Sequence, residues 1–272
     1  MLPVAILAYQ RPGEIKKIIE KSVTNKIYVS LDFPNLFLGA IKSMKSPTTS
    51  MVKLNEMYKN YYEIIKNVEE LQSSIKDKEI ILLKQSNKNL GIYSHAFKLF
   101  ELVFEKENDI IIFDDDIIPS KAFFYYANEL YKHGLPITGF TESYSASFNG
   151  TFTKCMVNQI WGLVFNKVFY EGLKEFCNFI KDDNNFKDSL KLFLEKSDSN
   201  NIDRWNKIDP NWAGSGRLHN YMDLYINMFC VINDINFIKP TVSLVSPSDN
   251  HYKYFPYEYK EVVNYTKNIT LI

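Results

Sequence analysis

Three consecutive carboxylates, Asp114, Asp115 and Asp116, directly follow the apolar run at residues 110–113. If that run is a buried strand, side chains two residues apart lie on one face, about 6–7 Å from each other. At an effective dielectric constant near 20, such a like-charge pair costs roughly 2–3 kcal/mol. A divalent cation turns this repulsion into coordination, and Mg²⁺ or Mn²⁺ binds carboxylates together with substrate phosphates. The triplet therefore predicts a Mn²⁺ or Mg²⁺ site.

Two other interpretations of the triplet remain open. Asp115 and Asp116 could instead cap a helix that begins near Ser120. A phosphohydrolase with a nucleophilic aspartate also carries such a motif, but there it normally follows the first strand. Here two or three strand–helix units precede it, which disfavours that reaction.

The first 116 residues alternate between strand and helix patterns. We expect strands at 4–8, 26–32, 79–83 and 109–113, and helices at 14–23, 52–75 and 95–104. This alternation predicts an α/β fold with a mostly parallel central sheet flanked by helices. Ligands of such sheets bind beyond the carboxyl ends of the strands, and Arg11, Asp32 and the triplet all follow strands there.

The second half is less regular. We expect a strand at 137–140, a helix at 161–180, a polar loop at 198–216, a helix at 217–232 and a strand at 237–245. The sequence contains neither an evident linker nor an internal repeat. We therefore predict one domain over residues 1–272, built from two fused halves at 1–118 and 119–272.

Asp223 is the one ionisable residue in an otherwise apolar helix segment, residues 221–232. A helix that is apolar on all sides is mostly buried, and a buried carboxylate is costly unless it is paired or faces a cleft. Asp223 is thus a candidate catalytic base. Pairing with His219 or Arg217 is the alternative, and Asp209 is a second candidate base.

The charge balance excludes several partners. Lys and Arg together number 32, as do Asp and Glu, so there is no overall field to attract nucleic acid.

No apolar stretch approaches the twenty residues of a membrane span. The three cysteines have neither disulfide nor metal spacing, which indicates a reducing compartment. We expect a cytoplasmic protein.

Residues 112–124, which contain the triplet, resemble the Glu-Asp-Asp signature of glycosyltransferases of the N-acetylglucosaminyltransferase I type. Several further segments are similar to motifs of that family or of its bacterial relatives, in the same order: residues 8–12, 30–32, 93–95, 159–164, 221–224 and 239–251. The resemblance implies a GT-A fold and an inverting glycosyltransferase that uses a nucleoside-diphosphate sugar, with UDP the expected nucleotide. It also implies transfer of a hexosyl or N-acetylhexosaminyl group.

The resemblance makes residues 1–118 the nucleotide-sugar-binding half and residues 119–272 the acceptor-side half, and it assigns roles in the donor site. Asp116 would be the direct metal ligand, and Asp114 or Asp115 would hold the ribose or the sugar hydroxyls. Arg11 and Asp32 would recognise the nucleobase, and His95 would contact the nucleotide.

On the acceptor side, the resemblance places the catalytic base at Asp223. His251 would contact the diphosphate or the metal, and Trp161 and Trp212 are candidates for a lid or a sugar contact. The acceptor would be a saccharide or lipid-linked saccharide, met by transient membrane contact.

Two other functions are kept as alternatives. A sugar nucleotidyltransferase has a related architecture, but it normally carries a Gly-rich phosphate loop after its first strand, where this sequence has a single glycine, Gly13. A non-catalytic saccharide-binding protein of the same fold is the second alternative.

Overall fold

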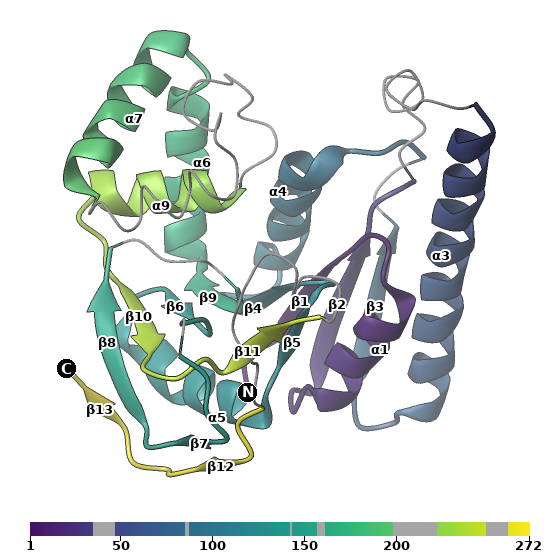
Figure 1. Cartoon of the computed structure of the whole chain (residues 1–272), viewed down its shortest axis with the longest axis horizontal. Coiled ribbons are helices and arrows are strands. Elements are labelled where there is room, and N and C mark those ends of the chain that lie inside the picture. The colour runs from purple at the N-terminus through teal and green to yellow at the C-terminus, as the bar shows by residue number, and fades with distance from the viewer. Residues whose placement is uncertain (35–46, 85–86, 142, 157–160, 198–221, 249–260) are drawn as a thin grey trace.

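The computed structural model describes residues 1–34, 47–84, 87–141, 143–156, 161–197, 222–248 and 261–272 (Figure 1). Nine of its strands form one mixed sheet in the order β13-β8-β10-β6-β9-β4-β1-β2-β3. Five of the eight neighbouring pairs are parallel. The expected α/β fold, with a mostly parallel central sheet flanked by helices, is confirmed.

The strands and helices of the first half agree closely with the expected positions. The strands are β1 (Val4–Ala8), β2 (Lys26–Leu31), β3 (Glu79–Lys84) and β4 (Asp109–Asp114), and β1 pairs in parallel with both β2 and β4. The connecting helices are α1 (Pro12–Lys21), α3 (Pro47–Ser74) and α4 (Gly91–Phe104). Because β1, β2 and β4 run in the same direction, the residues that follow them meet at one edge of the sheet.

The sheet separates two hydrophobic cores, as the alternation along β1 illustrates. Val4, Ile6 and Ala8 pack with α1 and α3, whereas Ala5 and Leu7 pack with α4. Successive side chains of a strand point to opposite faces, so a continuous apolar run belongs to a strand covered on both sides. Figure 1 shows α6, α7 and α9 gathered at the end of the sheet opposite α3.

Within the described ranges, the second half adds short strands and four longer helices. Its strands are β5 (Ile117–Pro119), β6 (Ile137–Thr138), β7 (Ser147–Phe148), β8 (Thr151–Cys155), β9 (Leu163–Asn166), β10 (Phe237–Pro240), β11 (Val245–Pro247), β12 (Asn264–Tyr265) and β13 (Thr270–Leu271). Its helices are α5 (Lys121–Leu130), the 3-10 helix η1 (Tyr131–His133), α6 (Lys167–Phe179), α7 (Asp183–Lys196) and α9 (Met222–Ile232). Helix α7 was not expected from the sequence.

The predicted helix at 161–180 is wrong in its first part. Residues 163–166 form β9, which pairs antiparallel with both β4 and β6. Helix α6 begins at Lys167, and Asn166 caps it, because its side-chain oxygen accepts a hydrogen bond from Phe169 N–H. Likewise, the strand expected at 237–245 is divided into β10 and β11. A short apolar run fits a buried strand or a buried helix equally well, so pairing partners decide between them.

None of the helices in the described part of the chain is long and apolar enough to cross a membrane. The three cysteines, Cys155, Cys177 and Cys230, are free thiols. The division of the chain into a donor half and an acceptor half stays a prediction.

Candidate functional site

Asp115 binds the loop between β1 and α1. Its Oδ2 accepts hydrogen bonds from the backbone N–H groups of Tyr9 (2.7 Å), Gln10 (2.8 Å) and Arg11 (3.2 Å). Its Oδ1 lies 2.8 Å from the Arg11 guanidinium. These amides lie at the N-terminus of α1, where the helix dipole favours a negative charge and no side chain of Arg11 caps the helix. Asp115 therefore fixes the loop that leads into α1 from a distant part of the chain.

This geometry overturns the capping alternative for the triplet. The helix after the triplet, α5, is capped by Ser120, whose Oγ accepts from Phe123 N–H at 3.3 Å. Asp115 and Asp116 precede β5 instead. Both carboxylate oxygens of Asp115 are engaged within the protein, so its predicted contact with the donor remains a prediction without support from the geometry.

Asp32 has the equivalent position at the N-terminus of α4. Its two oxygens accept from the N–H groups of Phe33 (2.9 Å), Leu90 (2.9 Å) and Gly91 (3.1 Å), and from Asn89 Nδ2 (2.8 Å). Gly91 has a φ of +75°, in the left-handed region that glycine adopts without strain. Only 3% of Asp32 is exposed. Its geometry is that of a carboxylate that fixes the start of α4, and its predicted role with a nucleobase stays a prediction.

His95 lies within the core beneath this edge. Its Nε2 is 2.8 Å from the Ser30 Oγ, and the residue is buried. Desolvation lowers the pKa of His95, although the nearby Asp32 charge, the hydrogen bond to Ser30 and the Asp115 charge act in the opposite direction. The neutral imidazole is thus favoured at neutral pH. Ser30 and His95 connect β2 with α4, and nucleotide contact by His95 stays a prediction.

Asp114, Asp116 and Asp223 form the unusual electrostatic feature of the site. Burial first, and then the charges of Asp116, Asp223 and Asp115, raise the pKa of Asp114 well above its usual range, while Arg11 acts in the opposite direction. The Arg11 guanidinium is also 3.5 Å from Asp116 Oδ2, and the Asp116 side chain is partly exposed, at 18%. Arg11 thus contacts Asp115 and Asp116, while the charges of these two residues and of Asp223 act together on Asp114.

Ser248 is a residue of this site that was not predicted from the sequence. Strand β11 pairs antiparallel with β5, and Ser248 N–H donates to the backbone oxygen of Asp116 at 2.6 Å. Ser248 is buried, and its Oγ has no hydrogen-bond partner within the described part of the chain. No local sequence signal identifies it, because its position depends on the pairing of β11 with β5.

Of the remaining predicted residues, Trp161 lies within the described ranges and the others lie outside them. Trp161 packs its ring edge-on against Phe140, with centroids 4.6 Å apart, and its backbone oxygen accepts from Gly139 N–H. This position is that of a packing residue of the core, and the lid or sugar contact stays a prediction. Trp212 and His251 lie outside the described residues, as do Asp209 and His219.

Across the described ranges, no group of three or more His, Cys, Asp or Glu side chains is arranged to hold a metal ion unaided. Of the three consecutive aspartates, Asp115 is fully occupied by protein donors. Asp116 and Asp114 are the carboxylates whose positions suit a cation. A site of this kind needs further oxygens from a bound substrate, and Mg²⁺ commonly binds in that way, through one or two carboxylates and substrate phosphates.

Comparison with known proteins finds no matching family model and no matching curated protein. Among solved structures, the chain is similar to a UDP-glucose pyrophosphorylase complexed with UDP-glucose, with a TM-score of 0.36 and 10% sequence identity. The match covers 64% of this chain and 80% of that one. That enzyme belongs with the sugar nucleotidyltransferases, the first alternative above, rather than with the glycosyltransferases. A likeness at this TM-score carries no argument about activity, so the function is argued from the site.

Proposed function

We propose that the chain is a metal-dependent, inverting glycosyltransferase that takes a hexosyl or N-acetylhexosaminyl group from a nucleoside-diphosphate sugar, with UDP as the expected nucleotide. The observation that carries the proposal is that the charges of Asp116 and Asp223 act on Asp114, the last residue of β4, at the carboxyl edge of the parallel strands. Their mutual repulsion is what raises the pKa of Asp114 beyond the effect of burial. A ligand that brings positive charge to this edge would relieve that repulsion.

A Mg²⁺ or Mn²⁺ ion fits the residues present. Asp116 would hold it, with Asp114 close by, and the donor diphosphate would supply further oxygens. When bound, such an ion neutralises the charge that develops on the departing diphosphate. The absence of a ready three-residue metal group within the described ranges agrees with a cation that arrives together with its substrate.

The contacts of Asp115 favour this transferase over a sugar nucleotidyltransferase. A phosphate loop binds a triphosphate through free backbone N–H groups at a helix N-terminus. Here the N–H groups of Tyr9, Gln10 and Arg11 already donate to the Asp115 carboxylate. A triphosphate would have to displace a buried anion to reach them. These three N–H groups are therefore occupied, and this part of the loop offers the Arg11 side chain to a ligand instead.

Asp223 is the base that this proposal assigns. It lies in the first turn of α9 and is near enough to Asp114 to raise its pKa. Its carboxylate would accept the proton of the acceptor hydroxyl while the new glycosidic bond forms at the anomeric carbon. The bond to the nucleoside diphosphate breaks in the same step, and that group leaves. General-base catalysis of this kind contributes typically about 10²–10⁴-fold to a rate.

The remaining residues would bind or position the donor. Arg11 is 29% exposed and could reach the nucleotide while it keeps its ion pair with Asp115. Ser248 would donate its buried Oγ–H to a donor oxygen, which would satisfy a group that has no partner in the described chain. Asp32 and His95 would act indirectly, because they hold α4 against β2. The acceptor would be a saccharide or a lipid-linked saccharide.

The test is a panel of nucleotide sugars incubated with Mn²⁺ or a chelator, with release of nucleoside diphosphate followed in the presence of saccharide acceptors. We expect release that depends on both the metal and one class of donor. Asp116→Asn should abolish the metal dependence. Asp223→Asn should bind the donor as before and lose turnover by about 10²-fold or more.

Asp188 provides the matched control, because it is an exposed aspartate of α7, far from the triplet in sequence, and Asp188→Asn should change nothing. Formation of pyrophosphate from a nucleoside triphosphate and a sugar phosphate would instead assign the nucleotidyltransferase reaction. Metal-independent donor binding without turnover would favour a non-catalytic saccharide-binding protein. Full turnover by Asp223→Asn would remove that residue from its role.

A further inference from the structure

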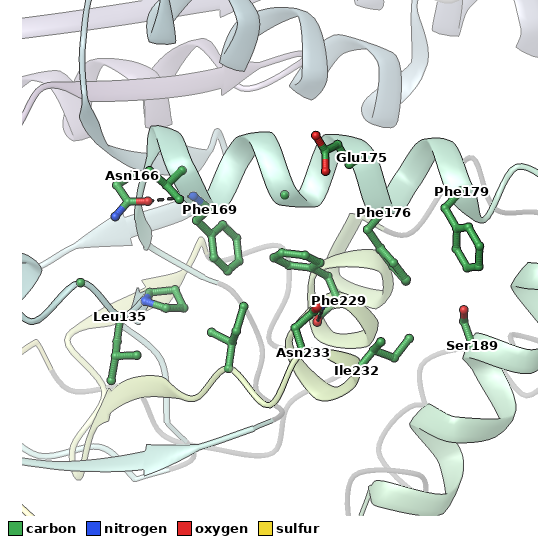
Figure 2. Close-up of a pocket in the computed structure, with 15 residues that line it drawn as sticks. Leu135, Asn166, Phe169, Glu175, Phe176, Phe179, Ser189, Phe229, Ile232 and Asn233 are labelled. Carbon is green, nitrogen blue, oxygen red and sulfur yellow. Dashed lines mark hydrogen bonds between the residues drawn. The ribbon is translucent and has the colours of Figure 1, made fainter.

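An elongated apolar cavity lies away from the aspartate cluster, between α6 and α9 (Figure 2). Its volume is about 680 Å³, within the range of roughly 300–1,000 Å³ that is typical of small-molecule sites. Residues 134–136 bound one end, and Ser189 of α7 lies at the other, beside Phe179. The cavity is thus a feature of the tertiary structure that the proposed transfer reaction does not use.

Aromatic rings form the wall of this cavity. The ring of Phe229 from α9 packs between Phe169 and Phe176 of α6, with centroid distances of 5.2 Å and 5.8 Å. Gly172 makes this approach possible, since a Cβ there would lie 2.9 Å from Phe229 Cζ. Figure 2 shows these rings directed toward the cavity from both helices.

The rim of the cavity exposes two large apolar side chains of α6. Val168 is 75% exposed and Phe179 is 55% exposed. They are eleven residues apart, which is about three helical turns, so they lie on nearly the same face and about 16 Å apart along the axis. The apolar strip is therefore long and narrow, and chain elements bound it at both ends.

Two polar side chains of the lining, Asn166 and Asn233, form hydrogen bonds within the protein. Asn166 Oδ1 accepts from Phe169 N–H at 2.8 Å, and Asn233 Nδ2 donates to the Phe229 backbone oxygen at 2.9 Å. The one charged side chain among the described lining residues is Glu175, and Figure 2 shows its carboxylate directed away from the cavity. No Lys or Arg is among those residues, so an anionic group would find no counter-ion there.

We infer that this cavity binds one linear hydrocarbon chain of an amphiphile whose uncharged head group stays at the rim. The length of the apolar strip favours a chain over a compact ring system, and the lack of a lining cation disfavours a carboxylate or phosphate head. This inference is independent of the proposed transferase activity, although a lipid tail that carries a sugar head group would suit both.

The test is calorimetric titration of the full chain with dodecyl maltoside, kept below the concentration at which it forms micelles. We expect one molecule to bind per chain. Maltose, which is the head group alone, should not bind at this site, and dodecanoate, with the same number of carbons and an anionic head, should bind more weakly. Tighter binding of dodecanoate, or equal binding of maltose, would overturn the inference.

Three variants locate the site. Gly172→Leu should displace the Phe229 ring that lines the cavity, since even a Cβ there lies 2.9 Å from Phe229 Cζ, and it should weaken binding about tenfold or more, which corresponds to roughly 1.4 kcal/mol. Val168→Glu and Phe179→Glu change exposed positions, so the protein should fold normally, and each should weaken binding about fivefold. Val263→Glu is the matched control, since Val263 is 66% exposed and does not line the cavity, and it should bind like the unmodified chain.

Two outcomes would identify a different occupant of the cavity. If Val168→Glu converts a dimer to a monomer in sedimentation, the strip is an interface between two copies. If the chain floats with phosphatidylcholine vesicles and Val168→Glu releases it, the strip contacts a bilayer surface. Unchanged dodecyl maltoside affinity in both Gly172→Leu and Val168→Glu would refute the site outright.

Discussion

Replacing Asp115 by Asn tests the view that the middle aspartate of the triplet is structural whereas its neighbours are functional. Asn has nearly the same shape and keeps one acceptor oxygen, but it carries no charge. If that oxygen accepts from the three backbone N–H groups, the new amide N–H₂ must face the Arg11 guanidinium, so two donors meet. The change therefore weakens four contacts without creating a large cavity.

The magnitude follows from these contacts. A hydrogen bond to a charged group contributes about 1.5–3 kcal/mol, whereas a neutral one contributes about 0.5–1.5 kcal/mol. Three weakened backbone contacts account for about 3 kcal/mol. Asp115→Asn also removes the ion pair between Arg11 and the Asp115 side chain, which is 5% exposed. Breaking a buried pair costs about 3–5 kcal/mol, so the total loss in the free energy of unfolding should approach that range.

The assay is urea unfolding in the presence of a chelator, compared with Asp116→Asn. Asp116 is more exposed and lies 3.5 Å from Arg11, so its replacement should change the free energy of unfolding by less than about 1 kcal/mol. Asp115→Asn should lower the urea midpoint by about 1–2 M at an unchanged m-value. A midpoint equal to that of the unmodified chain, or a larger loss for Asp116→Asn, would refute the assignment.

Three further outcomes are expected. Asp114→Asn should raise the melting temperature at pH 7–8 in the presence of a chelator. Because the folded state raises the pKa of Asp114, ionisation of this residue costs the folded protein stability, and this cost is absent below about pH 3.8 and grows as the pH rises through the folded-state pKa. The gain in melting temperature should therefore vanish in acid. The folded state lowers the pKa of His95, so the neutral imidazole contributes stability above about pH 6.5, and this contribution is lost as the pH falls toward the folded-state pKa. His95→Gln should therefore make the free energy of unfolding less dependent on pH between pH 7 and 5. Asp32→Ala should destabilise the start of α4 by about 1–3 kcal/mol, seen as faster hydrogen exchange at Leu90 and Gly91, and unchanged exchange there would contradict its capping role.

Much of the first half could be predicted because its signals are local. Continuous apolar runs that alternate with amphipathic segments indicate parallel strands and covering helices, and the strands at 4–8, 26–31 and 109–114 formed close to the expected residues. The second half could not be predicted in the same way. Strand β9 is a short apolar run that could form a strand or a helix, and its pairing with β4 and β6 makes it a strand.

The sequence by itself determined that Arg11, Asp32 and the aspartate triplet would follow parallel strands and hence meet at one edge of the sheet. Only the tertiary structure decided what each carboxylate meets. Helix N-termini attract anions from any part of the chain, so Asp115 binds the loop at the start of α1 and Asp32 binds the start of α4. Asp223 follows Asp114 by 109 residues, and only the fold brings it close enough to raise the pKa of Asp114.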